Sequence, residues 1–200
     1  MRGVGRKVTP KVVSGRVQKK NSHETTFNYF DQDPGYPVID RQRPGEGYRH
    51  LLTKADIQKF IDILPDWSEL SVGLKAIVLA EPDDCYGWHD RGVVAICAWD
   101  RVLWEEWDNE KFYLEHVSVL ERLGVKTEKL PNGNYEVQFT ENQARAFQLL
   151  HILLHELGHH HDQMSTKSKR TGRGEPYAEA YALKYMDAIW ADYIKRFPLY

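Results

Sequence analysis

The stretch that most constrains this chain is a long helix pattern with almost no charge. The helix is expected to begin at Thr140, which forms a capping box with Gln143, and to run to about His161. Charged residues are almost absent between Arg145 and Glu156, so the helix must be largely buried. The rest of the fold therefore has to pack around this helix.

The apolar part of this helix ends in the sequence His155-Glu156-Leu157-Gly158-His159. Helix positions i and i+4 share one face, so His155 and His159 can bind one tetrahedral metal ion together. Glu156 then lies beside the place where a metal-activated water would sit. Burying these three side chains without a partner would cost several kcal/mol, which disfavours the alternative of a hydrogen-bonded pair of core histidines.

Two carboxylates in a following helix extend the pattern. This last helix is predicted to begin near Pro176, because proline is favoured at the first helical position. Glu175 and Glu179 are four residues apart and share one face of an otherwise apolar helix. In a zinc site, one carboxylate would be the third ligand and the other would orient a ligand imidazole. Spacing alone does not show which of the two carboxylates is the ligand. The alternative to a zinc site is that both carboxylates face solvent.

Taken together, segments 155–162 and 175–181 resemble the gluzincin metallopeptidases, which combine HExxH with a glutamate from a following helix. They are most similar to the group that contains anthrax lethal factor and the secreted Pro-Pro endopeptidases. That group has an aspartate three residues after HExxH, and then a helix with the pattern E-x-x-A-E-A-aromatic. HExxH alone is moderately specific, whereas both halves together are a strong signal.

The resemblance assigns a role to each of these residues. It implies that His155, His159 and Glu175 are the ligands of one Zn²⁺ ion. It implies that Glu156 is the general base and that Glu179 is the acid that supports a ligand from outside the coordination shell. The E-x-x-A-E order favours Glu175 over Glu179 as the third ligand.

The chain departs from this family at one position. The family has a tyrosine shortly before the third ligand that steadies the oxyanion, but no tyrosine lies between residues 162 and 174 here. Transition-state stabilisation would have to come from another group. The candidates for oxyanion or substrate contacts are His160, Arg173 and Tyr177. Proline-directed specificity is not carried over.

The expected fold is α+β, a zincin-like metallopeptidase domain. It would combine a small mixed sheet with an active-site helix and a C-terminal helix that carries the third ligand. Apolar runs at 75–80 and 92–99 predict strands, and the resemblance makes the second one the edge strand that binds an extended peptide. The remaining predicted elements are a helix from Thr53 ended by Pro65, a loop at 81–92, a helix at about 101–123 and a hairpin at 125–139 with an Asn-Gly turn.

Charge divides the chain into two parts. The net charge is −2, but residues 1–23 carry seven Lys and Arg residues and no acid. Removing those seven from the 27 basic residues leaves 20 against 29 acidic residues, a net charge near −9. We therefore expect a basic, loosely ordered arm at 1–47 and a catalytic domain at 48–200. Residues 1–23 could contact nucleic acid or a protein partner, or remain a solvated tail.

Composition limits the functional classes. An apolar fraction of 42% indicates a globular chain, and the two cysteines give no disulfide framework. No signal peptide or transmembrane segment is visible, so we expect a cytoplasmic protein without a membrane partner. The predicted function is that of a zinc metalloendopeptidase acting on a peptide or protein substrate. The alternative is a regulatory zincin-fold protein that binds zinc structurally and uses its basic arm to bind nucleic acid or a partner.

Overall fold

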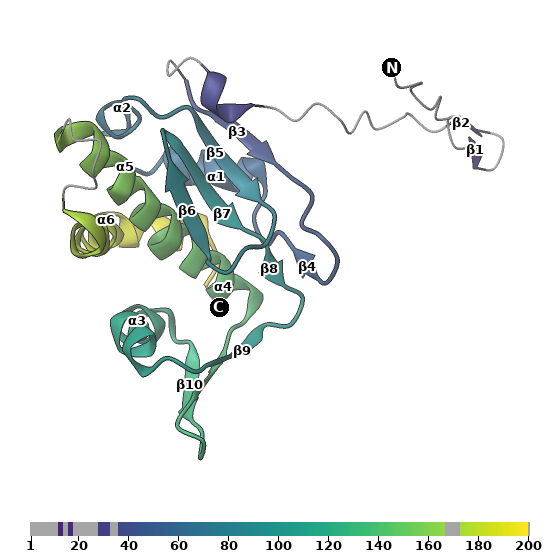
Figure 1. The fold of residues 1–200 in the computed structure, drawn as a ribbon, viewed down its shortest axis with the longest axis vertical. Helices are drawn as coiled ribbons and strands as arrows, with labels where there is room; N and C mark the ends of the chain where they lie inside the picture. The colour runs from purple at the N-terminus through teal and green to yellow at the C-terminus, as the bar shows by residue number, and fades with distance from the viewer. Residues whose placement is uncertain (1–11, 14–15, 18–27, 33–35, 167–172, 200) are drawn as a thin grey trace, which may run out of the picture.

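The computed structural model shown in Figure 1 describes residues 12–13, 16–17, 28–32, 36–166 and 173–199. Over these ranges the chain is a mixed α+β fold with several small sheets. None of the described helices is long and apolar enough to cross a membrane. The basic arm at 1–23 lies outside the described residues, except for two paired strands, β1 (Val12–Val13) and β2 (Arg16–Val17). Its predicted contact with nucleic acid or a partner therefore stays a prediction.

The largest described sheet has four strands in the order β3 (Val38–Arg41), β5 (Ala76–Ala80), β7 (Val93–Cys97) and β6 (Gly87–Asp90). The first three are parallel, and β6 is antiparallel to β7. Every residue of β5 and β7 is buried, as expected of central strands covered on both faces. The prediction of a small mixed sheet with these two strands is confirmed.

The two outer strands differ from the sequence prediction. β3 falls within the segment predicted to be a loosely ordered arm, and β6 falls within the predicted loop at 81–92. The assignment of 92–99 as the edge strand is wrong, because β7 pairs with β5 on one side and β6 on the other. The edges of this sheet are β3 and β6, and β6 is the edge strand that lies against α5. Its sequence Gly-Trp-His-Asp has no apolar run, so its pairing with β7 was not visible as a periodicity.

The predicted buried helix forms the layer beneath this sheet. It consists of α4 (Glu141–Phe147), a π-helical segment η2 (Gln148–Leu153) and α5 (Leu154–Thr166), joined without a break. The capping box at Thr140 and Gln143 is confirmed, since each backbone N–H donates to the other residue's side chain. η2 and α5 lie against β6 and β7, so the sheet and the helix enclose one apolar core.

A smaller part of the fold begins after the sheet. Strands β9 (Trp104–Trp107), β10 (Lys126–Lys129) and β11 (Tyr135–Gln138) form an antiparallel sheet, so the predicted hairpin is confirmed. The helix predicted from about residue 101 is wrong at its start, because α3 (Glu110–Leu123) begins only after the N-cap Asn109. The remaining elements are η1 (Tyr29–Asp31), β4 (Tyr48–Arg49), α1 (Lys54–Ile61), α2 (Trp67–Leu70) and β8 (Trp99–Asp100).

The last helix, α6 (Gly174–Arg196), packs along α5. Gly158 makes this close approach possible. A Cβ at that position would lie 2.9 Å from Ala178 Cα and 3.1 Å from Tyr181 Cβ. The central glycine of the HExxH segment therefore sets how near α6, and the carboxylates on it, can come to the two histidines.

Replacing Gly158 with alanine is expected to destabilise the protein. The added methyl group meets backbone, and overpacking of this kind costs about 1–3 kcal/mol, which outweighs the gain in helix propensity of about 1 kcal/mol. Thermal unfolding should show a lower midpoint than wild type. Ser118→Ala, on an exposed position of α3, is the matched control for propensity alone. A Gly158→Ala protein more stable than wild type would contradict the close contact.

Candidate metal centre

His155 and His159 lie one turn apart on the face of α5 that lines a cavity. Their Nε2 atoms are 3.1 Å apart, and the rings are nearly perpendicular. Two imidazole nitrogens at this distance either share one proton or present two lone pairs to the same point. Both side chains are largely buried, so solvent does not separate them. The predicted pair is therefore brought together.

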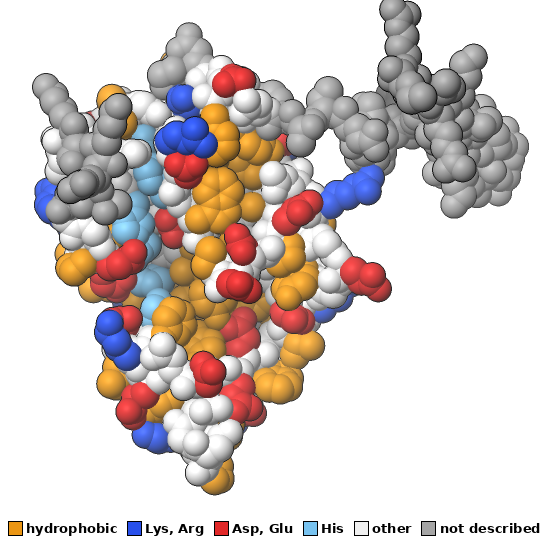
Figure 2. Space-filling model, in the orientation of Figure 1, with side chains coloured by type: hydrophobic (Ala, Val, Ile, Leu, Met, Phe, Trp, Pro, Cys, Tyr) orange, Lys and Arg blue, Asp and Glu red, His pale blue; other side chains and the backbone are white. Residues whose placement is uncertain are grey.

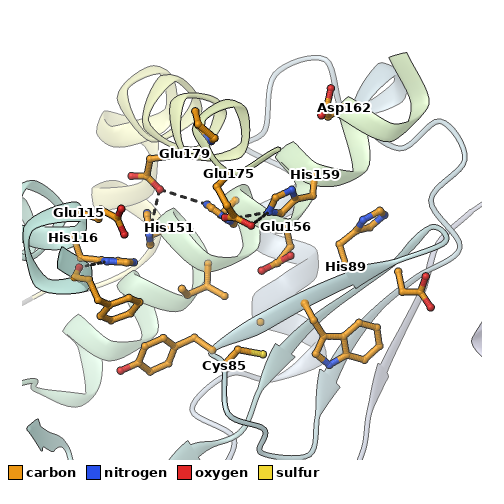
Figure 3. A pocket seen from close by; sticks show the side chains of 18 of the residues that line it. Cys85, His89, Glu115, His116, His151, Glu156, His159, Asp162, Glu175 and Glu179 are labelled. Carbon is orange, nitrogen blue, oxygen red and sulfur yellow. Dashed lines mark hydrogen bonds and ion pairs between the residues drawn. The ribbon is translucent and has the colours of Figure 1, made fainter. Parts of the chain in front are cut away.

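Glu175, in the first turn of α6, completes the group. Its Oε2 lies 3.0 Å from Nε2 of His155, and its Oε1 lies 3.4 Å from Nε2 of His159. The three ligand atoms lie within 4.8 Å of one another. Zinc–ligand bonds of about 2.0–2.1 Å at tetrahedral angles place ligand atoms about 3.3 Å apart. The observed separations fit this value, so the group could hold a metal ion (Figure 3).

Glu179, one turn further along α6, faces the opposite side of the His155 ring. Its Oε2 lies 3.4 Å from Nδ1 of His155 and 3.7 Å from Nε2 of His151. Nδ1 of His155 makes no hydrogen bond to a described residue, but the charge of the nearby Glu179 carboxylate favours a proton on Nδ1, which leaves Nε2 free as a lone pair. The geometry therefore separates the two carboxylates that spacing left interchangeable: Glu175 faces the Nε2 pair, and Glu179 faces Nδ1.

The carboxylates around His155 make the electrostatic potential at the site negative. Burial lowers the pKa of His155, but its interaction with the Glu179 carboxylate and the charges of Glu156 and Glu175 outweigh burial and raise it above its ordinary value. Burial lowers the pKa of His159. Carboxylates that stabilise a positive imidazole would equally stabilise a divalent cation between the two rings.

Glu156 is buried beside the ligand group, with 8% of its surface exposed. Burial raises the pKa of its carboxyl group to about 7. The side chain lines the same cavity as His155 and His159 and points toward β6 in Figure 3. A Cβ on Gly87 of β6 would lie 2.6 Å from Ile152 Cγ2, 2.8 Å from the carbonyl oxygen of Ala95 and 3.2 Å from Glu156 Cγ, so glycine allows this close approach of the edge strand.

The cavity has a volume of about 890 Å³ and lies between β6, α3, α5 and the start of α6. Trp88 and His89 of β6 form one wall, and Phe112 and His116 of α3 form another. Figure 2 shows histidine side chains as a pale-blue strip along a hollow on this face. The group of His155, His159 and Glu175 and the buried carboxylate of Glu156 therefore line one cavity.

The three residues predicted to contact the oxyanion or the substrate do not line this cavity. His160 is 1% exposed, and one of its ring nitrogens lies 2.9 Å from the carbonyl oxygen of Val72. Arg173 is bound to Asp162, and the hydroxyl of Tyr177 lies 2.7 Å from Nδ1 of His161. Each of these three side chains therefore has a partner outside the group of His155, His159 and Glu175.

Other residues that the sequence reasoning passed over do line the cavity. His151 is fully buried four residues before His155, and burial lowers its pKa to about 4. Its Nδ1 has no hydrogen-bond partner among the described residues. His116 of α3 is partly buried, and its ring centre lies 4.9 Å from that of His151. The i, i+4 spacing of His151 and His155 was the available signal.

Comparison with known proteins identified no relative of this chain. No protein family, no curated protein and no solved structure matches this chain. The interpretation of the site therefore depends on its residues and their geometry.

Proposed function

We propose that the protein is a zinc-dependent metallopeptidase with a zincin-like fold of the gluzincin type. One observation carries this proposal: His155, His159 and Glu175 bring three ligand atoms within 4.8 Å of one another in a cavity that the buried Glu156 also lines. Three protein ligands are typical of catalytic zinc sites, whereas structural sites use four. Hard and borderline donors of this type, two imidazoles and one carboxylate, suit Zn²⁺.

Each residue of the site has a different role in the proposed hydrolysis. A bound Zn²⁺ ion would supply Lewis acidity, which polarises a carbonyl and lowers the pKa of water. Glu156 accepts the proton of the attacking water and delivers it to the leaving amine. Glu179 holds the ring of His155 so that Nε2 faces the ligand position. Of the described groups, the neutral rings of His116 and His151 face the same cavity, where they can orient a substrate.

The edge strand supports a peptide as the substrate. Among the strands that the structure describes, β6 pairs only with β7, so its other edge offers unpaired backbone groups along the cavity. An extended peptide can add to such an edge as a further strand, which brings its carbonyl groups past the metal group. This is the role that the sequence assigned to 92–99, moved to the neighbouring strand.

A second cavity, of about 600 Å³, adjoins the first and shares Cys85, Tyr86 and Phe112 with it. Aromatic rings wall it, and six carboxylates but no Lys or Arg belong to its lining. None of these six forms an ion pair with a described residue: Asp83, Asp84, Asp100, Glu105, Glu106 and Asp108. Peptides that contain Lys or Arg are therefore the first substrates to test.

The proposal is tested by measuring metal content and cleavage together. We expect the purified protein to contain about one zinc ion per chain. It should cleave members of a peptide library rich in Lys and Arg, lose this activity on treatment with a chelator, and regain it when zinc is restored. Protein that holds no zinc, or that holds zinc and cleaves nothing in the library, would contradict the proposed function.

A further inference from the structure

The third ligand of the proposed centre is poorly held by its own surroundings. The side chain of Glu175 is 78% exposed, so packing does not fix it. It lies in the first turn of α6, whose N-cap residue Arg173 makes no capping hydrogen bond with its own side chain. The first four N–H groups of a helix need partners from elsewhere. Something outside α6 must therefore set the position of this turn.

Asp162 supplies those partners from α5. Its side chain is 2% exposed and lies three residues after His159. Oδ2 accepts hydrogen bonds from the backbone N–H groups of Arg173, at 2.8 Å, and Gly174, at 3.3 Å. Oδ1 accepts a hydrogen bond from Nε of Arg173 at 2.6 Å. The carboxylate thus caps α6 from another helix, and its charge also suits the positive end of the helix dipole.

A second contact lies beside the first. The guanidinium group of Arg173 stacks over the ring of Tyr177, 3.7 Å from its centre. The hydroxyl of Tyr177 in turn lies 2.7 Å from Nδ1 of His161. Adjacent residues of α5, His161 and Asp162, therefore hold residues on both sides of Glu175 along α6. We call these four side chains the α5–α6 clasp.

We propose that Asp162 is a positioning residue that fixes Glu175 over the imidazole pair by fastening the first turn of α6 to α5. The inference rests on the proposed metal centre. The helix that carries His155 and His159 also carries Asp162, so the three ligands are located by one rigid element (Figure 3). Burial raises the pKa of Asp162, but hydrogen bonds from Arg173 and Gly174 outweigh burial and lower it, so the carboxylate stays charged.

Cobalt substitution tests this inference without an activity assay. Asp162→Ala should bind Co²⁺ about 10–100-fold more weakly than wild type, the usual effect of losing a partner that orients a ligand. Its visible Co²⁺ spectrum should change toward that of Glu175→Gln. Asp187→Ala is the matched control, because it removes an α6 ion pair with Arg122 far along the helix and should keep the wild-type spectrum. A wild-type spectrum and affinity in Asp162→Ala would overturn the inference.

Hydrogen exchange in the metal-free protein separates the clasp from the metal centre. In Asp162→Ala, the backbone amides of residues 173–175, 177 and 178 should exchange faster than in wild type. In Arg173→Ala the increase should be smaller, because the backbone hydrogen bonds to Asp162 remain. If Asp162→Ala does not fold, Asp162→Asn, which keeps one acceptor, replaces it. Unchanged exchange in these variants would overturn the clasp. A wild-type protein that binds no Co²⁺ would instead overturn the proposed function, with exchange still deciding on the clasp.

Discussion

Replacing Glu156 with glutamine should abolish most hydrolysis while leaving the metal in place. Glutamine has nearly the same size and shape, but it cannot accept a proton from water. General acid–base catalysis contributes about 10²–10⁴-fold to rate, so peptide cleavage should fall by that factor. Zinc content should stay at the wild-type value, because Glu156 is not one of the three converging ligands. Cleavage rate and metal stoichiometry, measured on the same sample, check both parts.

The control for this variant is a carboxylate in the same cavity with no place in the mechanism. Glu115 lines the cavity from α3, and its ion-pair partner among the described residues is Lys111 in the turn before it. Glu115→Gln removes the same charge from the same groove, so it should change the rate far less than Glu156→Gln. Undiminished activity in Glu156→Gln, or an equal loss in both variants, would exclude Glu156 as the general base.

The parts of the fold that could be predicted are those set by neighbouring residues. The helix start at Thr53 and the capping box at Thr140 each depend on a span of four residues, and both are present. The αL cap at Gly124 and the hairpin that follows are equally local. The His155–His159 pair follows from helix geometry alone. In each case the interaction that stabilises the element lies within a few residues along the chain.

The parts that could not be predicted depend on distant partners. Trp104 and Trp107 have helix-like spacing, but cross-strand pairing of β9 with β11 overrides it. The π-helical turn at 148–153 has no sequence signal, and such turns are frequent at functional sites. The capping role of Asp162 joins residues 11 positions apart, across a segment that no periodicity covers. The family resemblance includes this aspartate but assigns no role to it.

Replacing Glu175 with glutamine should weaken metal binding more than replacing Glu179 with glutamine. Glu175 faces both Nε2 atoms and would supply a negative ligand atom in the proposed centre, so Glu175→Gln would remove that charge and leave at most a weaker amide ligand. Glu179 acts through Nδ1 of His155, and losing such an outer partner usually costs about 10–100-fold in affinity. The loss of metal affinity in Glu175→Gln should therefore be larger than this range. Competition with a chromophoric chelator measures the affinity of each variant.

The same pair of variants also distinguishes the two roles by their chemistry. Glu179→Gln leaves an amide oxygen that can still accept the Nδ1 proton of His155, so the tautomer and the ring orientation should survive in part. Its Co²⁺ spectrum should stay close to that of wild type, whereas the spectrum of Glu175→Gln should not. If Glu179→Gln weakened binding more than Glu175→Gln, the two carboxylates would have exchanged roles. The third ligand would then sit one turn further along α6, and the α5–α6 clasp at Asp162 would orient an outer partner in place of a ligand.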